Sequence, residues 1–166
     1  MKPYLNSNVL KIWTWVLLAP LILEAIALYY QYGLDYGPCT LCVQIRATLT
    51  ATIILGLLGL LLKNMLAQRV FSLIFSSLMI FFLYQCYLLL GIERSWFESS
   101  CTLTNAFPAW MPLDQWLPSM FEPWELCGYT PYIVGSISMA EILLLTAVIS
   151  VLVSLYQVTL CFRHRL

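Results

Sequence analysis

The chain has 166 residues, of which 61% are hydrophobic and only 10% are charged, whereas a soluble domain carries about 25% charged residues. A soluble core of this size cannot hide so much apolar surface, so lipid must be part of the solvent, and the length indicates one domain. Eight basic residues balance eight acidic ones, and the absence of a basic patch excludes a nucleic-acid partner.

Four apolar runs are long enough to cross the hydrocarbon layer, for which a helix needs about 20 residues. They cover roughly residues 12–32, 43–62, 70–92 and 137–160. Helices are expected because lipid offers no hydrogen-bond partner to a bare backbone group. The fourth run lies within 132–162 and exceeds one span, so its first turns lie at the interface or the helix tilts. We therefore expect an all-α fold, an integral membrane four-helix bundle that forms one domain over residues 1–166.

Basic residues gather on one side of these spans, and this predicts the orientation. They are Lys2, Lys11, Lys63, Arg69, Arg163 and Arg165, while Arg94 is the one basic residue on the other side. By the positive-inside rule, both termini are cytoplasmic and the loops 33–42 and 93–131 face outward. A competing interpretation reads residues 17–27 as a cleaved signal peptide, but the apolar run continues past them.

The predicted topology sorts the six cysteines by side. Cys39, Cys42, Cys101 and Cys127 fall in or beside the outward loops, Cys86 falls inside the third span, and Cys161 falls at the cytoplasmic end of the fourth. Disulfides persist in oxidising compartments such as the bacterial periplasm, so the four outward cysteines can pair. Cys86 and Cys161 are expected to be small buried apolar residues.

Cys39 and Cys42 are three positions apart and follow Pro38, where the second helix is expected to begin. A bridge across so short a loop removes little chain entropy, so a purely structural disulfide explains this pair poorly. A close-spaced pair at a helix N-terminus is typical of an exchangeable, redox-active disulfide. A zinc site is an alternative, but the one histidine, His164, is on the cytoplasmic side, and we expect no metal.

Arg46 lies one turn beyond Cys42 on the same face of the expected helix, about 6 Å along its axis. Its charge and the helix N-terminus both favour a thiolate at Cys42. A charge inside a span indicates a functional site, here a donor to a bound polar group; a side chain that snorkels to the headgroups is the alternative. Glu24 and Glu141 are also acids inside spans, either interfacial or paired within the bundle, and we assign them no role.

The long outward loop contains an apolar segment, FPAWMPLDQWLPSMFEPW, at residues 107–124. From Trp110 on, apolar residues recur every three or four positions, and Pro112 occupies a helix-initiating position. This predicts a short helix in the outer membrane interface, anchored by tryptophans; packing on the bundle without lipid contact is the alternative. Either arrangement holds the cysteines of this loop near the Cys39–Cys42 pair.

These features together resemble the DsbB family of inner-membrane thiol oxidases. The resemblance covers most of the chain: four spans, CTLCVQIR at the start of the second, and CTLTNAFPAWMPLDQWLPSMF followed by a further cysteine between the third and fourth. The chain departs from the best-known pattern at Ile45, where an acid often precedes the arginine, and in its brief cytoplasmic tail.

The resemblance implies a protein-disulfide:quinone oxidoreductase of the bacterial inner membrane that supports disulfide bond formation. It implies that Cys101–Cys127 is attacked by a periplasmic thioredoxin-like oxidase of the DsbA type. Cys39–Cys42 would be the disulfide beside the quinone, which is ubiquinone or menaquinone, and Arg46 with Cys42 would bind it. A relay from DsbA through DsbB to quinone is already known to keep the periplasm oxidising.

Two other classes of protein remain as alternatives. The first is a non-enzymatic four-span membrane protein with inert disulfides in its outer loop, which leaves the tight Cys39–Cys42 pair and Arg46 unexplained. The second is a quinone or epoxide reductase of the vitamin K type, which also places a CxxC motif beside a quinone-like ring. In that class we expect the CxxC late in the chain, and here it is early.

Overall fold

The part of the chain that the structure describes is a bundle of four long helices. The computed structural model describes residues 7–62, 64–96, 106–128 and 130–163. The long helices are α1 (Ser7–Gly33), α2 (Thr40–Leu61), α3 (Met65–Glu93) and α6 (Met139–Arg163). All four are long and apolar enough to cross a membrane, which confirms the expected all-α membrane fold.

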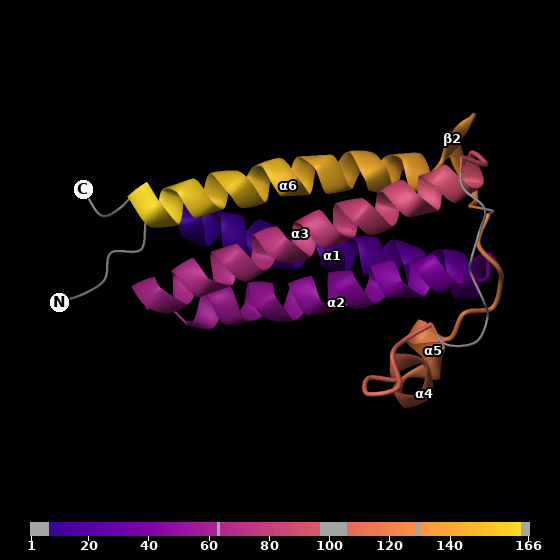
Figure 1. Cartoon of the computed structure of the whole chain (residues 1–166), viewed down its shortest axis with the longest axis horizontal. Helices are drawn as coiled ribbons and strands as arrows, with labels where there is room; N and C mark the ends of the chain where they lie inside the picture. Colours follow the sequence, from indigo (N-terminus) through magenta and orange to yellow (C-terminus); the bar gives the residue numbers. More distant parts are fainter. Residues whose placement is uncertain (1–6, 63, 97–105, 129, 164–166) are drawn as a thin grey trace.

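The connections between helices divide between the two ends of the bundle. The turn from α2 to α3 and the last turns of α6 lie at one end, and the loop elements that connect α3 to α6 lie at the other (Figure 1). Helix α3 packs most extensively against α6, and α1 against α2, whereas α1 and α6 touch at few places. The segments expected to face outward therefore share one end of the molecule.

Small residues on α2 allow α1 to approach closely. A Cβ atom added at Gly56 would lie 3.0 Å from the backbone nitrogen of Leu17, and one at Gly59 would lie 2.4 Å from Cδ2 of Trp13. The Trp13 indole is fully buried and donates to Oε1 of Gln68, whose Nε2 donates to the Gly59 carbonyl at 2.7 Å. Close backbone approach and buried polar contacts are what hold helices together in lipid, where apolar burial gives little drive.

The segment before α6 departs from the sequence-based expectation. We expected the first turns of the fourth span there, but Tyr132–Val134 (β1) and Ile137–Ser138 (β2) form an antiparallel hairpin. Gly135 sits at its turn with φ +58, a conformation that glycine adopts without steric cost. Helix α6 starts only at Met139, because Ser138 and Glu141 cap its first turn reciprocally.

The apolar segment of the long loop forms two short helices instead of one. They are α4 (Leu113–Trp116) and α5 (Pro118–Phe121). Pro118 explains the break, since a proline disfavours helical backbone at the preceding residue, and Leu117 has φ −139. Phe121 is buried against the protein, whereas Trp110, Trp116 and Leu117 are exposed. The segment thus presents an apolar outer face.

Candidate redox site

The structure joins Cys39 and Cys42 in a disulfide with their Cα atoms 4.9 Å apart, as the spacing predicted. Cys39 is the N-cap residue of α2, with extended backbone, and its carbonyl accepts the Val43 N–H at 3.0 Å. The Cys42 N–H donates to Sγ of Cys39 at 3.2 Å. The pair therefore occupies the first turn of a helix, where the unpaired N–H groups and the helix dipole stabilise negative charge on sulfur.

The second loop lies directly against this disulfide. The backbone N–H groups of Trp124 and Glu125 donate to the Pro38 carbonyl at 2.9 and 3.3 Å, and Glu125 forms a parallel β-bridge with Cys39. Gly37 permits this approach, because a Cβ there would lie 2.9 Å from Cβ of Trp124. The tertiary structure thus brings the loop 93–131 into contact with the loop 33–42.

Cys127 follows this contact by two residues. It is 9% exposed, belongs to the same buried cluster as Cys39, and takes part in a disulfide. Cys101 lies outside the residues that the structure describes. The pairing of Cys101 with Cys127 therefore stays a prediction, while the contact of Cys39 with Glu125, two residues before Cys127, is an observation.

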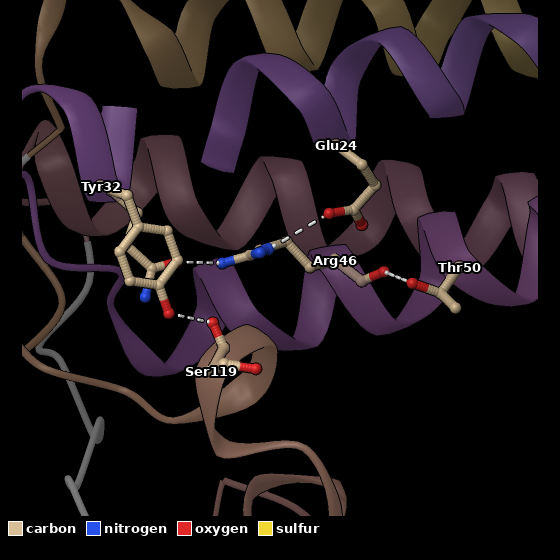
Figure 2. A network of polar contacts seen from close by, with 6 residues as sticks. Glu24, Tyr32, Arg46, Thr50 and Ser119 are labelled. Carbon is tan, nitrogen blue, oxygen red and sulfur yellow. Dashed lines mark hydrogen bonds and ion pairs between the residues drawn. The ribbon is translucent and has the colours of Figure 1, made fainter. Parts of the chain in front are cut away.

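Two side chains of the bundle hold the loop that contains α4 and α5. Gln44 Nε2 donates to the Ala106 carbonyl at 2.7 Å, and the Tyr32 hydroxyl donates to the Ser119 carbonyl at 2.5 Å (Figure 2). The Tyr32 ring also meets Trp124 edge-on, with centroids 6.0 Å apart. Sequence reasoning missed these anchors, since nothing in the local pattern around Tyr32 or Gln44 indicates a partner in the loop.

Arg46 is the centre of a buried polar network between α1 and α2 (Figure 2). Its Nε donates to Oε2 of Glu24 at 3.2 Å, and its Nη1 donates to Oε1 of Gln31 at 2.7 Å. Arg46, Glu24 and Gln31 are 3%, 4% and 1% exposed. A guanidinium so enclosed does not snorkel; it is held inside the bundle by an ion pair and a neutral hydrogen bond.

A cavity of about 150 Å³ lies beside this network and the disulfide. Its wall is mostly apolar side chains of α1, α2 and α6, among them Leu23, Ile26, Ile45, Leu49, Ile142 and Leu143. Cys42, Arg46 and Gln31 also line it. Arg46 Nη2 and Gln31 Nε2 are buried and have no hydrogen-bond partner. The cavity therefore combines a mostly apolar wall with one cysteine of the disulfide and with two residues that each carry an unpaired N–H donor.

The structure also places the residues to which the sequence assigned no redox role. Cys86 and Cys161 are free and buried, as expected. Glu24 pairs with Arg46, and Glu141 forms an ion pair with Arg94 at the end of α3. Glu24 is thus paired inside the bundle, whereas Glu141 forms a partly exposed pair in the first turn of α6; the sequence alone had left both alternatives open.

Four membrane-length helices and a disulfide beside an apolar, cation-lined cavity define a multi-pass membrane protein of thiol–disulfide chemistry. The family model described as Disulfide bond formation protein DsbB matches residues 10–157. The chain therefore belongs to the DsbB family and is a disulfide bond formation protein.

Three curated relatives illustrate how far the similarity extends. Disulfide bond formation protein B of Shewanella frigidimarina is 34% identical over 140 residues, which are 80% of this chain and 80% of the relative. Disulfide bond formation protein B 2 of Pseudomonas aeruginosa is 31% identical over 131 residues, 77% of this chain and 78% of the relative. The Mannheimia succiniciproducens protein is 31% identical over 152 residues, 87% of this chain and 84% of the relative. The similarity thus spans most of each chain.

Proposed function

We propose that this protein is a protein-disulfide:quinone oxidoreductase that reoxidises a periplasmic thioredoxin-like oxidase of the DsbA type. The observation that carries the proposal is one cavity lined by Cys42, Arg46 and Gln31 between lipid-facing helices. A membrane protein with inert disulfides has no need for a buried cation and unpaired donors beside one of them. The known relay of the family makes the same assignment.

The residues around the cavity fit a quinone. A quinone ring is apolar on its faces and carries two carbonyl acceptors, and the cavity offers apolar side chains together with N–H donors on Arg46 and Gln31. A buried donor without a partner is costly, so a carbonyl oxygen at this place offsets that cost. A bound ubiquinone or menaquinone supplies the two-electron acceptor.

The relay begins at Cys101. A partner thiolate attacks its sulfur and breaks the predicted Cys101–Cys127 bond, and the Cys127 thiolate then attacks Cys39. The Cys39–Cys42 bond breaks in turn and leaves Cys42 as a thiolate beside Arg46. The partner's second thiolate breaks the bond between the partner and Cys101, and the partner leaves as a disulfide. The released Cys101 thiolate then displaces Cys39 from Cys127, which restores Cys101–Cys127 and leaves Cys39 and Cys42 as a dithiol. Oxidation of the partner's dithiol releases two electrons and two protons, which are what a quinone takes up on becoming a quinol. Each exchange is favoured by an ionised attacking sulfur and a leaving thiol of low pKa.

We further propose that the protein lies in the bacterial inner membrane. The end of the bundle that holds α4 and α5 faces the periplasm, and both termini are in the cytoplasm. The excess of Lys and Arg at the other end supports this orientation. The exposed Trp110 and Trp116 then lie at the outer interface, where tryptophan is favoured. An impermeant thiol reagent applied to intact cells after reduction should label Cys39 or Cys42 on this side; labelling only after lysis would contradict the orientation.

One experiment tests the proposed activity directly. The protein is purified in detergent, its co-purified quinone is identified, and quinone absorbance is followed during stoichiometric addition of a reduced thioredoxin-like oxidase. We expect one quinone reduced for each partner dithiol oxidised. Partner oxidation without quinone reduction, or no oxidation at all, would contradict the proposal.

Replacement of Arg46 by alanine is expected to raise the apparent KM for quinone by about tenfold to a hundredfold, because a charge-assisted hydrogen bond contributes about 1.5–3 kcal/mol. Steady-state rates at varied concentrations of a short-chain quinone measure this effect. Arg69→Ala is the control, since Arg69 lies at the other end of the bundle and donates to the Cys161 carbonyl. An unchanged KM in Arg46→Ala would show that the guanidinium is purely structural.

Replacement of Gly37 by valine is expected to slow exchange between the two cysteine pairs by at least about tenfold, since small misplacements of reacting groups are costly. The new side chain would push Trp124 and Glu125 away from the Cys39 segment. Quenched alkylation at successive times reports which pair is reduced. Gly33→Ala is the control, because the three atoms nearest to its added Cβ all belong to the Tyr29 ring of the same helix. Equal exchange rates in Gly37→Val and the unaltered protein would contradict a direct transfer between the loops.

A further inference from the structure

Gln31 is a buried residue of α1 to which the relay assigns no task. It lies seven residues, about two helical turns, beyond Glu24 and so on the same helical face. Its side chain is 1% exposed, accepts from Arg46, and lines the cavity that Cys42 also lines. The Gln31 amide has both an acceptor and a donor. The acceptor is used by Arg46, so the question is what the donor binds in so buried a position beside an apolar cavity.

The contact with Arg46 fixes which end of the Gln31 amide points elsewhere. A guanidinium has only donors, so the group 2.7 Å from Arg46 Nη1 must be the amide oxygen Oε1. The amide nitrogen Nε2, a donor, is then turned away from Arg46. It is buried and has no hydrogen-bond partner.

The donors of Arg46 can be accounted for in the same way. Nε is engaged by Glu24 and Nη1 by Gln31, while Nη2 is buried without a partner. Nη2 belongs to the planar guanidinium of Arg46 and Nε2 to the planar amide of Gln31. Each group is already held in place by a hydrogen bond through another of its atoms. The network therefore leaves two N–H donors without a partner, both on residues that line one cavity.

We propose that Gln31 is a second quinone-binding residue, which donates from Nε2 to a ring oxygen alongside Arg46 Nη2. This inference rests on the proposed function and adds to it a donor on α1. Because Arg46 comes from α2, binding through both residues ties the ligand to two helices. The contact contributes to quinone affinity and polarises one carbonyl, and it takes no part in exchange between the cysteine pairs.

The test is a binding measurement on the fully oxidised protein, in which no electron transfer can occur. Gln31→Glu keeps an acceptor toward Arg46 and removes the amide donor. We expect the Kd for a short-chain quinone, measured by quenching of tryptophan fluorescence in detergent, to rise about tenfold, as loss of one buried hydrogen bond predicts. Gln85→Glu is the matched control, because Gln85 is equally buried, accepts from Thr48, and lies outside the cavity lining; its Kd should be unchanged.

Infrared difference spectra of carbonyl-labelled quinone provide a second measurement, which reports bound ligand only. A hydrogen-bonded carbonyl stretches at lower frequency, so one carbonyl band should be shifted down in the unaltered protein and less so in Gln31→Glu. If Gln31→Glu does not fold, Gln31→Met takes its place under the same criteria. An unchanged Kd and an unchanged carbonyl band would overturn the role of Gln31 while quinone binding stands; failure of the unaltered protein to bind quinone would overturn the proposed function itself.

Discussion

Replacing Cys42 with serine is expected to abolish quinone reduction, with a loss of more than about a thousandfold, as is typical when a nucleophilic residue is removed. Among the described residues that line the cavity, Cys42 is the one cysteine. A serine hydroxyl does not ionise near neutral pH and cannot form a disulfide with Cys39, so electrons have no way to leave the first loop. Quinone absorbance after addition of a reduced thioredoxin-like oxidase measures the effect.

The same variant should still capture the partner. Cys101 and Cys127 remain intact, so a mixed disulfide with the reduced oxidase should accumulate and appear on a non-reducing gel. Cys161→Ser is the control, because Cys161 is a free buried thiol at the other end of the bundle, and it should reduce quinone at the normal rate. Quinone reduction by Cys42→Ser at the rate of the unaltered protein would refute the assigned role.

Replacing Glu24 with leucine is expected to destabilise the protein by about 3–5 kcal/mol, the typical effect of breaking a buried ion pair on one side. Arg46 would keep its charge, at 3% exposure, with only Gln31 as a polar partner. Thermal unfolding in detergent, followed by circular dichroism, measures the loss. We also expect weaker quinone binding, because the Arg46 guanidinium would lose the hydrogen bond from its Nε atom to Glu24 and would no longer be held in one orientation.

A double variant separates the ion pair from the packing of Glu24. In Glu24→Leu with Arg46→Leu no uncompensated charge remains, so most of the lost stability should return, as it does where buried ion pairs are replaced by apolar residues. The double variant should still fail to bind quinone normally. If it is as unstable as Glu24→Leu alone, the destabilisation comes from packing and not from the unpaired charge.

The site depends on a buried ion pair for its geometry. Glu24 does not line the cavity, yet it engages Arg46 Nε and so decides which donor of the guanidinium stays open. A lone arginine could turn toward water or headgroups. The pair with Glu24 and the contact with Gln31 hold it inside the bundle, which explains why a chain with so few charges places two of them in its interior.

Local features of the site could be predicted from the sequence because they depend on near neighbours along the chain. The spacing of Cys39 and Cys42 after Pro38 predicted a disulfide in the first turn of a helix, and the structure has it. Arg46 follows one turn later by helical periodicity alone. The partners of Arg46 could not be predicted, since Glu24 and Gln31 are 22 and 15 residues away, and their contact depends on how α1 and α2 are rotated against each other.

The sequence by itself determined that lipid is part of the protein's solvent and that four segments are long enough to span it, and it predicted thiol–disulfide chemistry. Apolar length, the distribution of basic residues and a CxxC motif at a helix start are properties that composition and short-range spacing carry. Only the tertiary structure decided that Trp124 and Glu125 pair with Pro38, that Glu24 and Gln31 orient Arg46, and that residues 132–138 form a hairpin. Short apolar runs suit a helix or a strand equally well, and contacts between distant segments follow from packing, which no local pattern records.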